Sequence, residues 1–343
     1  MQTFRRWLLF IIINLMVIFA MTVSLAQPSV VKVILKEAHR AERYSAVIIG
    51  QSHAETSVNP FIMSELSGSE TLNCAKRVMP LESCFYILKD VNLSGRIKRV
   101  FLEIDPGYWD DGDGIMAGYD LNALYFLSWR LKGEYLIKEL AEKSFTSALF
   151  DYSLTGETIK KIPRTLKSKL NMNYFAKSEQ SVFYSNATIG TSKNYEYIGR
   201  GYKRGVGKDE NTSLIKWRFE EAEVSENTLE CFSEIAGYCR DNGIELICFI
   251  SAVSPERLRA ENHGDVHEYY AGICGRENVR FIDMNFVKPE YFKLDGAAFV
   301  DADGHMKSEL ADRQTEALCK LSSEEDNAGC FFESYKEVLA ALE

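Results

Sequence analysis

The sequence predicts an α/β protein built on a doubly wound, mostly parallel sheet. Short apolar runs rich in β-branched residues alternate with longer segments in which apolar residues recur at intervals of three and four. This alternation is typical of parallel strands joined by helices. The chain has 343 residues, of which 46% are hydrophobic and 26% charged. That composition is typical of a globular protein, and the length allows a full-sized core.

The amino terminus differs in character from the rest of the chain. Arg5 and Arg6 precede residues 7–26, a run of 20 residues without a charge. About 20 apolar residues can span a bilayer, and arginines on the amino side favour that end in the cytoplasm. We therefore expect residues 1–26 to be a single-pass membrane anchor with the body outside the cytoplasm. The alternative is a cleaved signal peptide, which would also export the domain.

The α/β domain is expected at residues 45–343, after a connecting helix at 27–44. Within the domain, residues 225–243 have apolar side chains at helical spacing, a serine at the start and Asn-Gly at the end. Helix, glycine stop and apolar strand in that order form half of a parallel crossover unit. Four core strands are expected, at residues 46–49, 100–104, 245–250 and 279–282.

A segment at about 108–224 interrupts this alternation. We expect helices at 121–142 and 159–170 and a long loop at 184–207. Residues 157–218 hold 13 Lys+Arg against 5 Asp+Glu, although the whole chain has a net charge of −9. The insertion is interpreted either as a lid or substrate platform facing an anionic polymer or lipid headgroups, or as added core helices with a solvated basic face.

The eight cysteines show no Cys-x-x-Cys metal or redox spacing. We expect no metal site and no cofactor. An exported protein can pair its cysteines. Cys74 with Cys84 and Cys319 with Cys330 are candidate pairs. Buried free thiols are the alternative that we favour.

Ser52 is the first candidate site residue. The apolar run 46–49 stops at Gly50-Gln-Ser, where the glycine allows a sharp turn. This leaves Ser52 at the carboxyl end of a strand, where open α/β sheets bind their ligands. A serine hydroxyl becomes a strong nucleophile when a base removes its proton. The alternative is a turn serine that caps the following helix.

His305 is the candidate base. It lies in Phe299-Val-Asp-Ala-Asp-Gly-His-Met, directly before a predicted helix at 307–321. Asp301 and Asp303 are both candidates for the acid that orients its ring. An early serine and a late Asp/His loop are one chain order for a Ser-His-Asp triad. Otherwise, His305 is a surface histidine.

Residues 50–60, Gly-Gln-Ser-His-Ala-Glu-Thr-Ser-Val-Asn-Pro, resemble the opening block of the SGNH (GDSL-like) hydrolase superfamily. The resemblance is closest to its membrane-anchored branch, which includes the D-alanyl-lipoteichoic-acid biosynthesis protein D and bacterial polysaccharide O-acyltransferases. It covers about residues 45–107 and 225–320. It implies an SGNH-like fold and acyl-serine chemistry, without a cofactor, on a cell-envelope polymer.

The chain departs from the family pattern in its acid. That family usually has Asp three residues before His, but Ala302 occupies this position and the carboxylates stand at Asp301 and Asp303. Either one of them orients His305 after a shift of the loop, or the acid is displaced.

The family's Gly-x-Asn-Asp block is also missing, and residues 103–109 take its place. Asn73 and the backbone near Gly50 and Ser52 are therefore the candidates for stabilising an oxyanion. His53, which follows the candidate nucleophile, is a candidate substrate contact.

These observations support two main hypotheses. The first is an exported enzyme that performs acyl transfer or ester hydrolysis on a cell-envelope polysaccharide or teichoic-type polymer, through an acyl-serine. Its expected partners are the membrane, the polymer and a membrane-bound protein that supplies the acyl group; no nucleic acid is expected. The second is a non-catalytic SGNH-like scaffold for polymer assembly. A secreted lipase is a weaker third possibility.

Overall fold

The structure is a computed structural model. It describes residues 2–25, 30–41, 43–77, 79–109, 127–142, 193–209, 218–324 and 327–342, together with residues 163, 167 and 170.

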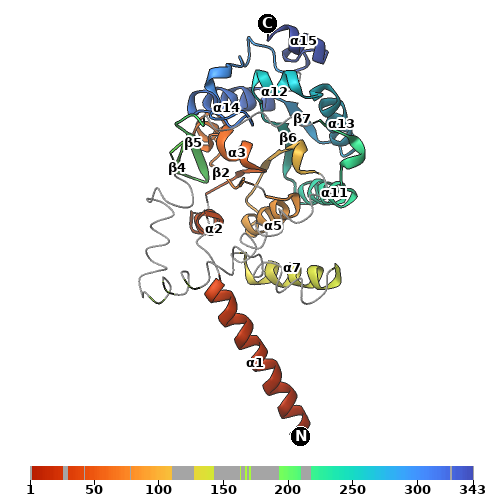
Figure 1. Ribbon diagram of the computed structural model, residues 1–343. Helices are drawn as coiled ribbons and strands as arrows, with labels where there is room; N and C mark the ends of the chain where they lie inside the picture. Colours follow the sequence, from red (N-terminus) through yellow and green to blue (C-terminus); the bar gives the residue numbers. More distant parts are fainter. Residues whose placement is uncertain are drawn as a thin grey trace.

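A five-stranded sheet of parallel strands forms the centre of the molecule (Figure 1). The strand order is β2-β1-β3-β6-β7. Four strands are those that the sequence predicts, and the fifth, β2, is a three-residue strand that it does not. The predicted α/β class with a parallel sheet is confirmed. The strands are β1 (Ala46–Ile49), β2 (Thr71–Asn73), β3 (Arg99–Glu103), β6 (Glu245–Ile250) and β7 (Arg280–Asp283).

Helices cover both faces of the sheet because its central strands are apolar on both sides. In β1, Val47 and Ile49 pack into one core cluster and Ile48 into another. The first cluster includes side chains of α2 (Val30–Ala41), α5 (Leu81–Val91), α11 (Glu226–Asp241) and α13 (His263–Arg276). The second includes side chains of α3 (Ser52–Ser57), α4 (Pro60–Ser67) and α14 (Ser308–Ser323).

The helix predicted at 225–243 is α11, and its beginning follows the expected chemistry. Ser225 is the N-cap residue, and its side chain accepts a hydrogen bond from the Thr228 backbone N–H. The remaining helices in the described part of the chain are α7 (Trp129–Glu142), α12 (Pro255–Ala260), α15 (Tyr335–Ala340) and the 3₁₀ turns Pro106–Tyr108, Glu221–Glu223, Gly296–Ala298 and Ala328–Cys330.

The strand order has a direct consequence for the location of a site. In chain order the five strands take the arrangement 2-1-3-4-5, which reverses direction between β1 and β3. In open α/β sheets, ligands bind beyond the carboxyl ends of the strands at such a switch point. Ser52 follows β1, and Glu103 and Asp105 stand at the end of β3.

At the amino terminus, α1 (Gln2–Leu25) extends away from the body of the molecule (Figure 1). Its described side chains include exposed Trp7 and Phe10. Among the described residues, no helix provides a stretch that is both long and apolar enough to cross a bilayer. The transmembrane helix predicted for this end of the chain is therefore not found.

The insertion agrees with its prediction at one place and differs at another. Helix α7, Trp129–Glu142, lies within the helix predicted at 121–142, of which residues 121–126 are outside the described residues. The expected long loop contains an antiparallel hairpin of β4 (Tyr195–Gly199) and β5 (Tyr202–Gly205). The helix predicted at 159–170 lies mostly outside the described residues.

All eight cysteines are within the described residues, where they are buried and form no disulfide bond. Burial raises the pKa of several of these thiols, for example that of Cys239 to about 12. The candidate pairs, Cys74 with Cys84 and Cys319 with Cys330, are not formed. The favoured expectation of buried thiols agrees with this arrangement.

Candidate active site

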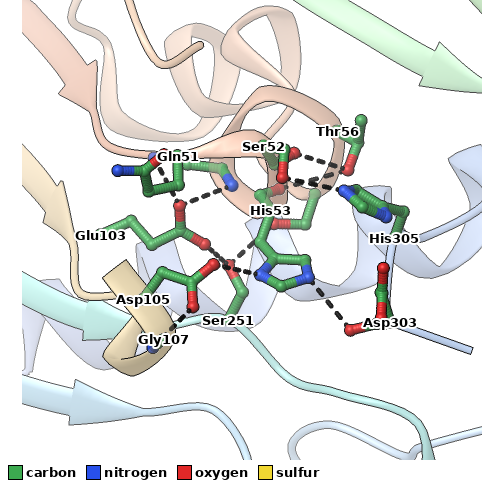
Figure 2. A network of polar contacts seen from close by, with 12 residues as sticks. Gln51, Ser52, His53, Thr56, Glu103, Asp105, Gly107, Ser251, Asp303 and His305 are labelled. Carbon is green, nitrogen blue, oxygen red and sulfur yellow. Dashed lines mark hydrogen bonds and ion pairs between the residues drawn. The ribbon is translucent and has the colours of Figure 1, made fainter. Parts of the chain in front are cut away.

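Ser52 is placed by a sharp turn between β1 and α3. The turn requires glycine, because Gly50 has φ of +145° and a Cβ there would lie 2.6 Å from the Glu103 Cβ. Ser52 is the first residue of α3 and is 6% exposed. Its side chain thus stands at the switch point of the sheet and faces His305 (Figure 2).

Ser52, His305 and Asp301 form a connected triad. The Ser52 Oγ lies 2.9 Å from the His305 Nε2, and the His305 Nδ1 lies 2.7 Å from the Asp301 Oδ2. The ring therefore donates from Nδ1 to the carboxylate, which leaves Nε2 to accept the serine proton. This is the geometry that a general base needs to activate a hydroxyl.

Asp301, not Asp303, orients His305. The loop makes this possible at a spacing of four residues because the Asp301 Oδ1 also accepts from the His305 backbone N–H, at 3.1 Å. The Val300 N–H donates to the His305 carbonyl at 2.7 Å and closes the turn. At Asp303 the hydrogen bonds with His53 and Arg257 involve the backbone carbonyl instead of the carboxylate.

The β4–β5 hairpin supplies a fourth member of this chain. The Tyr195 hydroxyl donates to the Asp301 Oδ2 at 3.1 Å, and its ring lies 6.2 Å from that of His305. Burial raises the pKa of Asp301, but the hydrogen bonds from His305 and Tyr195 and the His305 charge outweigh it and lower the pKa to about 2. Asp301 is therefore ionised at neutral pH.

The buried carboxyl group of Glu103 binds the backbone on both sides of Ser52. Its Oε2 accepts from the backbone N–H groups of Gln51 and Ala54, each at 2.9 Å, and its Oε1 accepts from the Ser251 hydroxyl at 2.8 Å (Figure 2). Burial raises the pKa of Glu103. The His53 charge and the hydrogen bonds from the Ser251 hydroxyl and the Ala54 N–H act in the opposite direction.

His53 does not join the triad but lies against it. Its ring centroid is 4.8 Å from that of His305, and its nitrogens contact Asp105 Oδ2 and the Asp303 carbonyl. His53 is 7% exposed. The sequence-based prediction of a substrate contact at His53 is not tested by these protein contacts.

Asn73 is not available as an oxyanion donor in this arrangement. Both protons of its buried amide are used, with the Ala54 and Val58 carbonyls at 2.8 and 3.0 Å. Its Oδ1 accepts from the Ala75 N–H. The role of Asn73 is therefore to hold the chain after β2 against α3. From the sequence, Asn73 is proposed as an oxyanion donor because the family's Asn block is missing. The sequence does not reveal that both amide protons of Asn73 are bound to backbone carbonyls.

The backbone near Gly50 and Ser52 has different roles. The Gly50 carbonyl accepts from the Lys76 N–H at 3.1 Å, and the Gln51 N–H is bound to Glu103. The Ser52 N–H lies in the first turn of α3, where amide groups have no carbonyl four residues earlier within the helix. It is therefore a candidate for stabilising an oxyanion.

Sequence reasoning missed Tyr195, Asp105 and Glu103. Glu103 leaves a detectable signal, since a carboxylate that ends a fully apolar strand needs buried donors. Tyr195 leaves none, because it comes from a segment that resembles a loop. Within the described residues, no cluster of three or more His, Cys, Asp or Glu side chains is arranged to hold a metal ion.

No protein-family model and no curated protein sequence matches the chain. One similar solved structure is that of a lipolytic protein of the G-D-S-L family from Desulfitobacterium hafniense. The two share 9% identity with a TM-score of 0.37, over 81% of this chain and 99% of that chain. A likeness at this level shows neither a family nor an activity, so the function must be argued from the geometry of the site.

Proposed function

We propose that this protein is a serine-dependent enzyme that cleaves acyl esters and passes the acyl group to water or to a hydroxyl. The observation that carries the proposal is the 2.9 Å contact between the Ser52 Oγ and the His305 Nε2, continued to Asp301 at 2.7 Å. Ser52 and the 301–305 loop, which are distant in the sequence, converge in the order that acyl transfer requires. The resemblance of residues 50–60 to the opening block of SGNH hydrolases supports the same chemistry.

The arrangement suggests how each residue acts. His305 takes the Ser52 proton at Nε2 as the Oγ attacks the acyl carbonyl, and the ionised Asp301 stabilises the imidazolium that forms. The Ser52 N–H donates to the oxyanion. His305 then returns the proton to the leaving alcohol, and an acyl-serine remains. Water or an acceptor hydroxyl, deprotonated by the same ring, releases the acyl group.

The finer parts of the proposal concern the substrate and the location. We propose a cell-envelope polysaccharide or teichoic-type polymer as the substrate, and a protein anchored to the cell membrane with this site outside the cytoplasm. A membrane-bound protein would supply the acyl group. The support is in the sequence: the uncharged run 7–26 after two arginines, and the excess of lysine and arginine in residues 157–218.

Ester turnover by the full-length protein tests the proposal. We expect steady hydrolysis of p-nitrophenyl acetate by the wild type. Ser52→Ala should lose at least about 10³-fold in kcat, as nucleophile replacements do. Ser67→Ala is the matched control, because this hydroxyl bonds the Met63 carbonyl in α4.

The same measurement distinguishes the enzyme from the non-catalytic scaffold. A folded wild-type protein that turns over no faster than Ser52→Ala would favour the scaffold. Adding polyol or oligosaccharide acceptors then separates transfer from hydrolysis. A transferase should form acylated acceptor in preference to free acid when water is in large excess.

A further inference from the structure

The ring of His53 lies beside the triad and is held by two acceptors (Figure 2). Its Nδ1 is 2.9 Å from the Asp105 Oδ2, and its Nε2 is 3.1 Å from the Asp303 carbonyl oxygen. A carboxylate and a backbone carbonyl can only accept, whereas a neutral imidazole has one N–H. Both contacts are hydrogen bonds only when both ring nitrogens carry a proton. This arrangement therefore holds His53 as an imidazolium.

The surroundings of His53 favour that cation. Burial lowers its pKa, but the charge and hydrogen bond of Asp105 and the charge of Glu103 raise it by more, to about 9. The Arg257 charge acts in the opposite direction. Titratable or charged groups from several elements face His53 or line the small cavity beside it. They are Glu103 and Asp105 from β3 and the turn after it, Arg257 and Glu261 from α12 and its end, His263 from the start of α13, and His305 from the loop before α14.

The carbonyl that His53 binds lies inside the loop that carries the base. Asp303 is the middle residue between Asp301 and His305, and Gly304 beside it has φ of +106°. Arg257 donates to the same carbonyl through Nη1. Two cationic side chains thus hold one backbone oxygen in place. Because this oxygen lies in the turn that carries Asp301 and His305, we expect a shift of it to move both side chains.

We propose that His53 is a positioning residue: as an imidazolium it holds the Asp303 carbonyl and thereby keeps His305 aligned on Ser52. When the Nε2 proton leaves to solvent, a nitrogen lone pair faces the carbonyl lone pairs and the bond is lost. Arg257 remains bound, so the loop loosens without detaching. The inference rests on the proposed function, because the alignment matters only if His305 acts as the base.

This role predicts an unusual pH profile. A serine enzyme with one histidine base gains activity as that histidine loses its proton and then stays level. Loss of the His53 proton adds a second limb, so kcat/KM should fall again around pH 9. Misplacement of a catalytic group costs up to about 100-fold in rate. We therefore expect kcat to fall about 10- to 100-fold, with little change in KM.

Three variants of the full-length protein test this role by ester turnover from pH 6 to 10. In His53→Gln, which does not titrate, kcat should be about 10- to 100-fold lower and the alkaline limb absent. In His53→Arg, which keeps a charge and two donors, part of kcat should return, again without the limb. The matched control is His39→Gln, since His39 also pairs with a buried aspartate, Asp90, at 2.9 Å. Its profile should equal that of the wild type.

The inference is overturned if the wild type has no alkaline limb, or if His53→Gln keeps the limb and the wild-type kcat. A readout without turnover keeps the test open if a variant does not fold or if the protein is not an esterase. In ¹⁵N NMR of the wild-type imidazoles, both His53 nitrogens should stay protonated up to about pH 9. Loss of the Nε2 proton above that pH should shift the His305 signals. Deprotonation of His53 below pH 7 would refute the role, whereas absent turnover alone would refute the proposed function.

Discussion

The orienting acid shows how much a single residue contributes to the site. Asp301 uses one oxygen for the His305 ring and the other for the His305 backbone N–H. The same carboxylate thus sets the ring orientation and shapes the loop. Its low pKa keeps it ionised over the working pH range, so it can stabilise the imidazolium throughout.

Replacement of the two neighbouring aspartates should therefore give opposite results. In Asp301→Asn the amide no longer stabilises the imidazolium, and kcat for ester hydrolysis should fall by about 10³- to 10⁴-fold. Asp303→Asn is the matched control, because the bonds to Asp303 go to its backbone. It should stay within about threefold of the wild type. Equal losses in both variants would contradict the assignment.

At this scale the sequence predicts the partners better than their geometry. Ser52 and His305 are recognisable because one ends a strand at Gly-x-Ser and the other precedes a helix beside two acids. The choice between Asp301 and Asp303 is not, since it depends on how the 301–305 turn is closed. Asn73 illustrates the reverse problem: its residue type fits an oxyanion donor, but its protons are occupied by backbone carbonyls.

Among the elements, the β4–β5 hairpin couples the insertion to the catalytic centre. Tyr195 bonds Asp301, while Tyr202 on the paired strand is completely buried. Within the described part of the chain, the Tyr202 hydroxyl has no hydrogen-bond partner. The two tyrosines offer a comparison between a hydroxyl that supports the triad and one that is merely buried.

Tyr195→Phe should lower kcat by about 5- to 10-fold, because one hydrogen bond to a charged group contributes about 1 kcal/mol or more. The free energy of unfolding should drop by a similar amount. Tyr202→Phe should leave kcat unchanged and leave stability equal or slightly higher, since it removes an unpaired buried group. Steady-state kinetics and urea unfolding of both variants measure kcat and the free energy of unfolding. A Tyr202→Phe enzyme as impaired as Tyr195→Phe would indicate packing rather than hydrogen bonding.

Elements with a strong local pattern were predictable. Strand β6 is a run of apolar residues. Helix α11 has apolar residues at helical spacing, a capping serine at its start and a glycine directly after its end. Strand β2 was missed because three residues carry too little pattern, and it forms by pairing with β1, which is distant in sequence. The hairpin was missed because its glycines and polar residues favour a loop, whereas its antiparallel pairing is a tertiary effect.

For the whole molecule, the buried charges at the switch point link stability to pH. The folded state raises the pKa of His53 from 6.5 to about 9. Its contribution to stability is thus complete below about pH 6.5 and is lost as the pH rises through 9. Such a shift corresponds to on the order of 3 kcal/mol. Asp301 has the opposite pH dependence, because its lowered pKa stabilises the folded state at neutral pH and this stabilisation is lost as the pH falls through about 2.

The difference in unfolding free energy between the wild type and His53→Gln should therefore shrink from pH 6 to pH 9.5. Urea unfolding at several pH values measures it. The comparison cancels the ionisation of cysteines in the unfolded chain, which is common to both proteins. A difference that stays constant over this range would mean that His53 is not held as a cation.

The central claim is that His305 activates Ser52 in the folded protein. Mass spectrometry after treatment with a fluorophosphonate tests it most directly, because the reagent reports an activated serine without requiring the natural substrate. We predict one adduct per chain, located on the Ser52 peptide, and none in His305→Ala or in urea-unfolded protein. An unlabelled Ser52 in folded wild-type protein, or equal labelling in His305→Ala, would contradict the account.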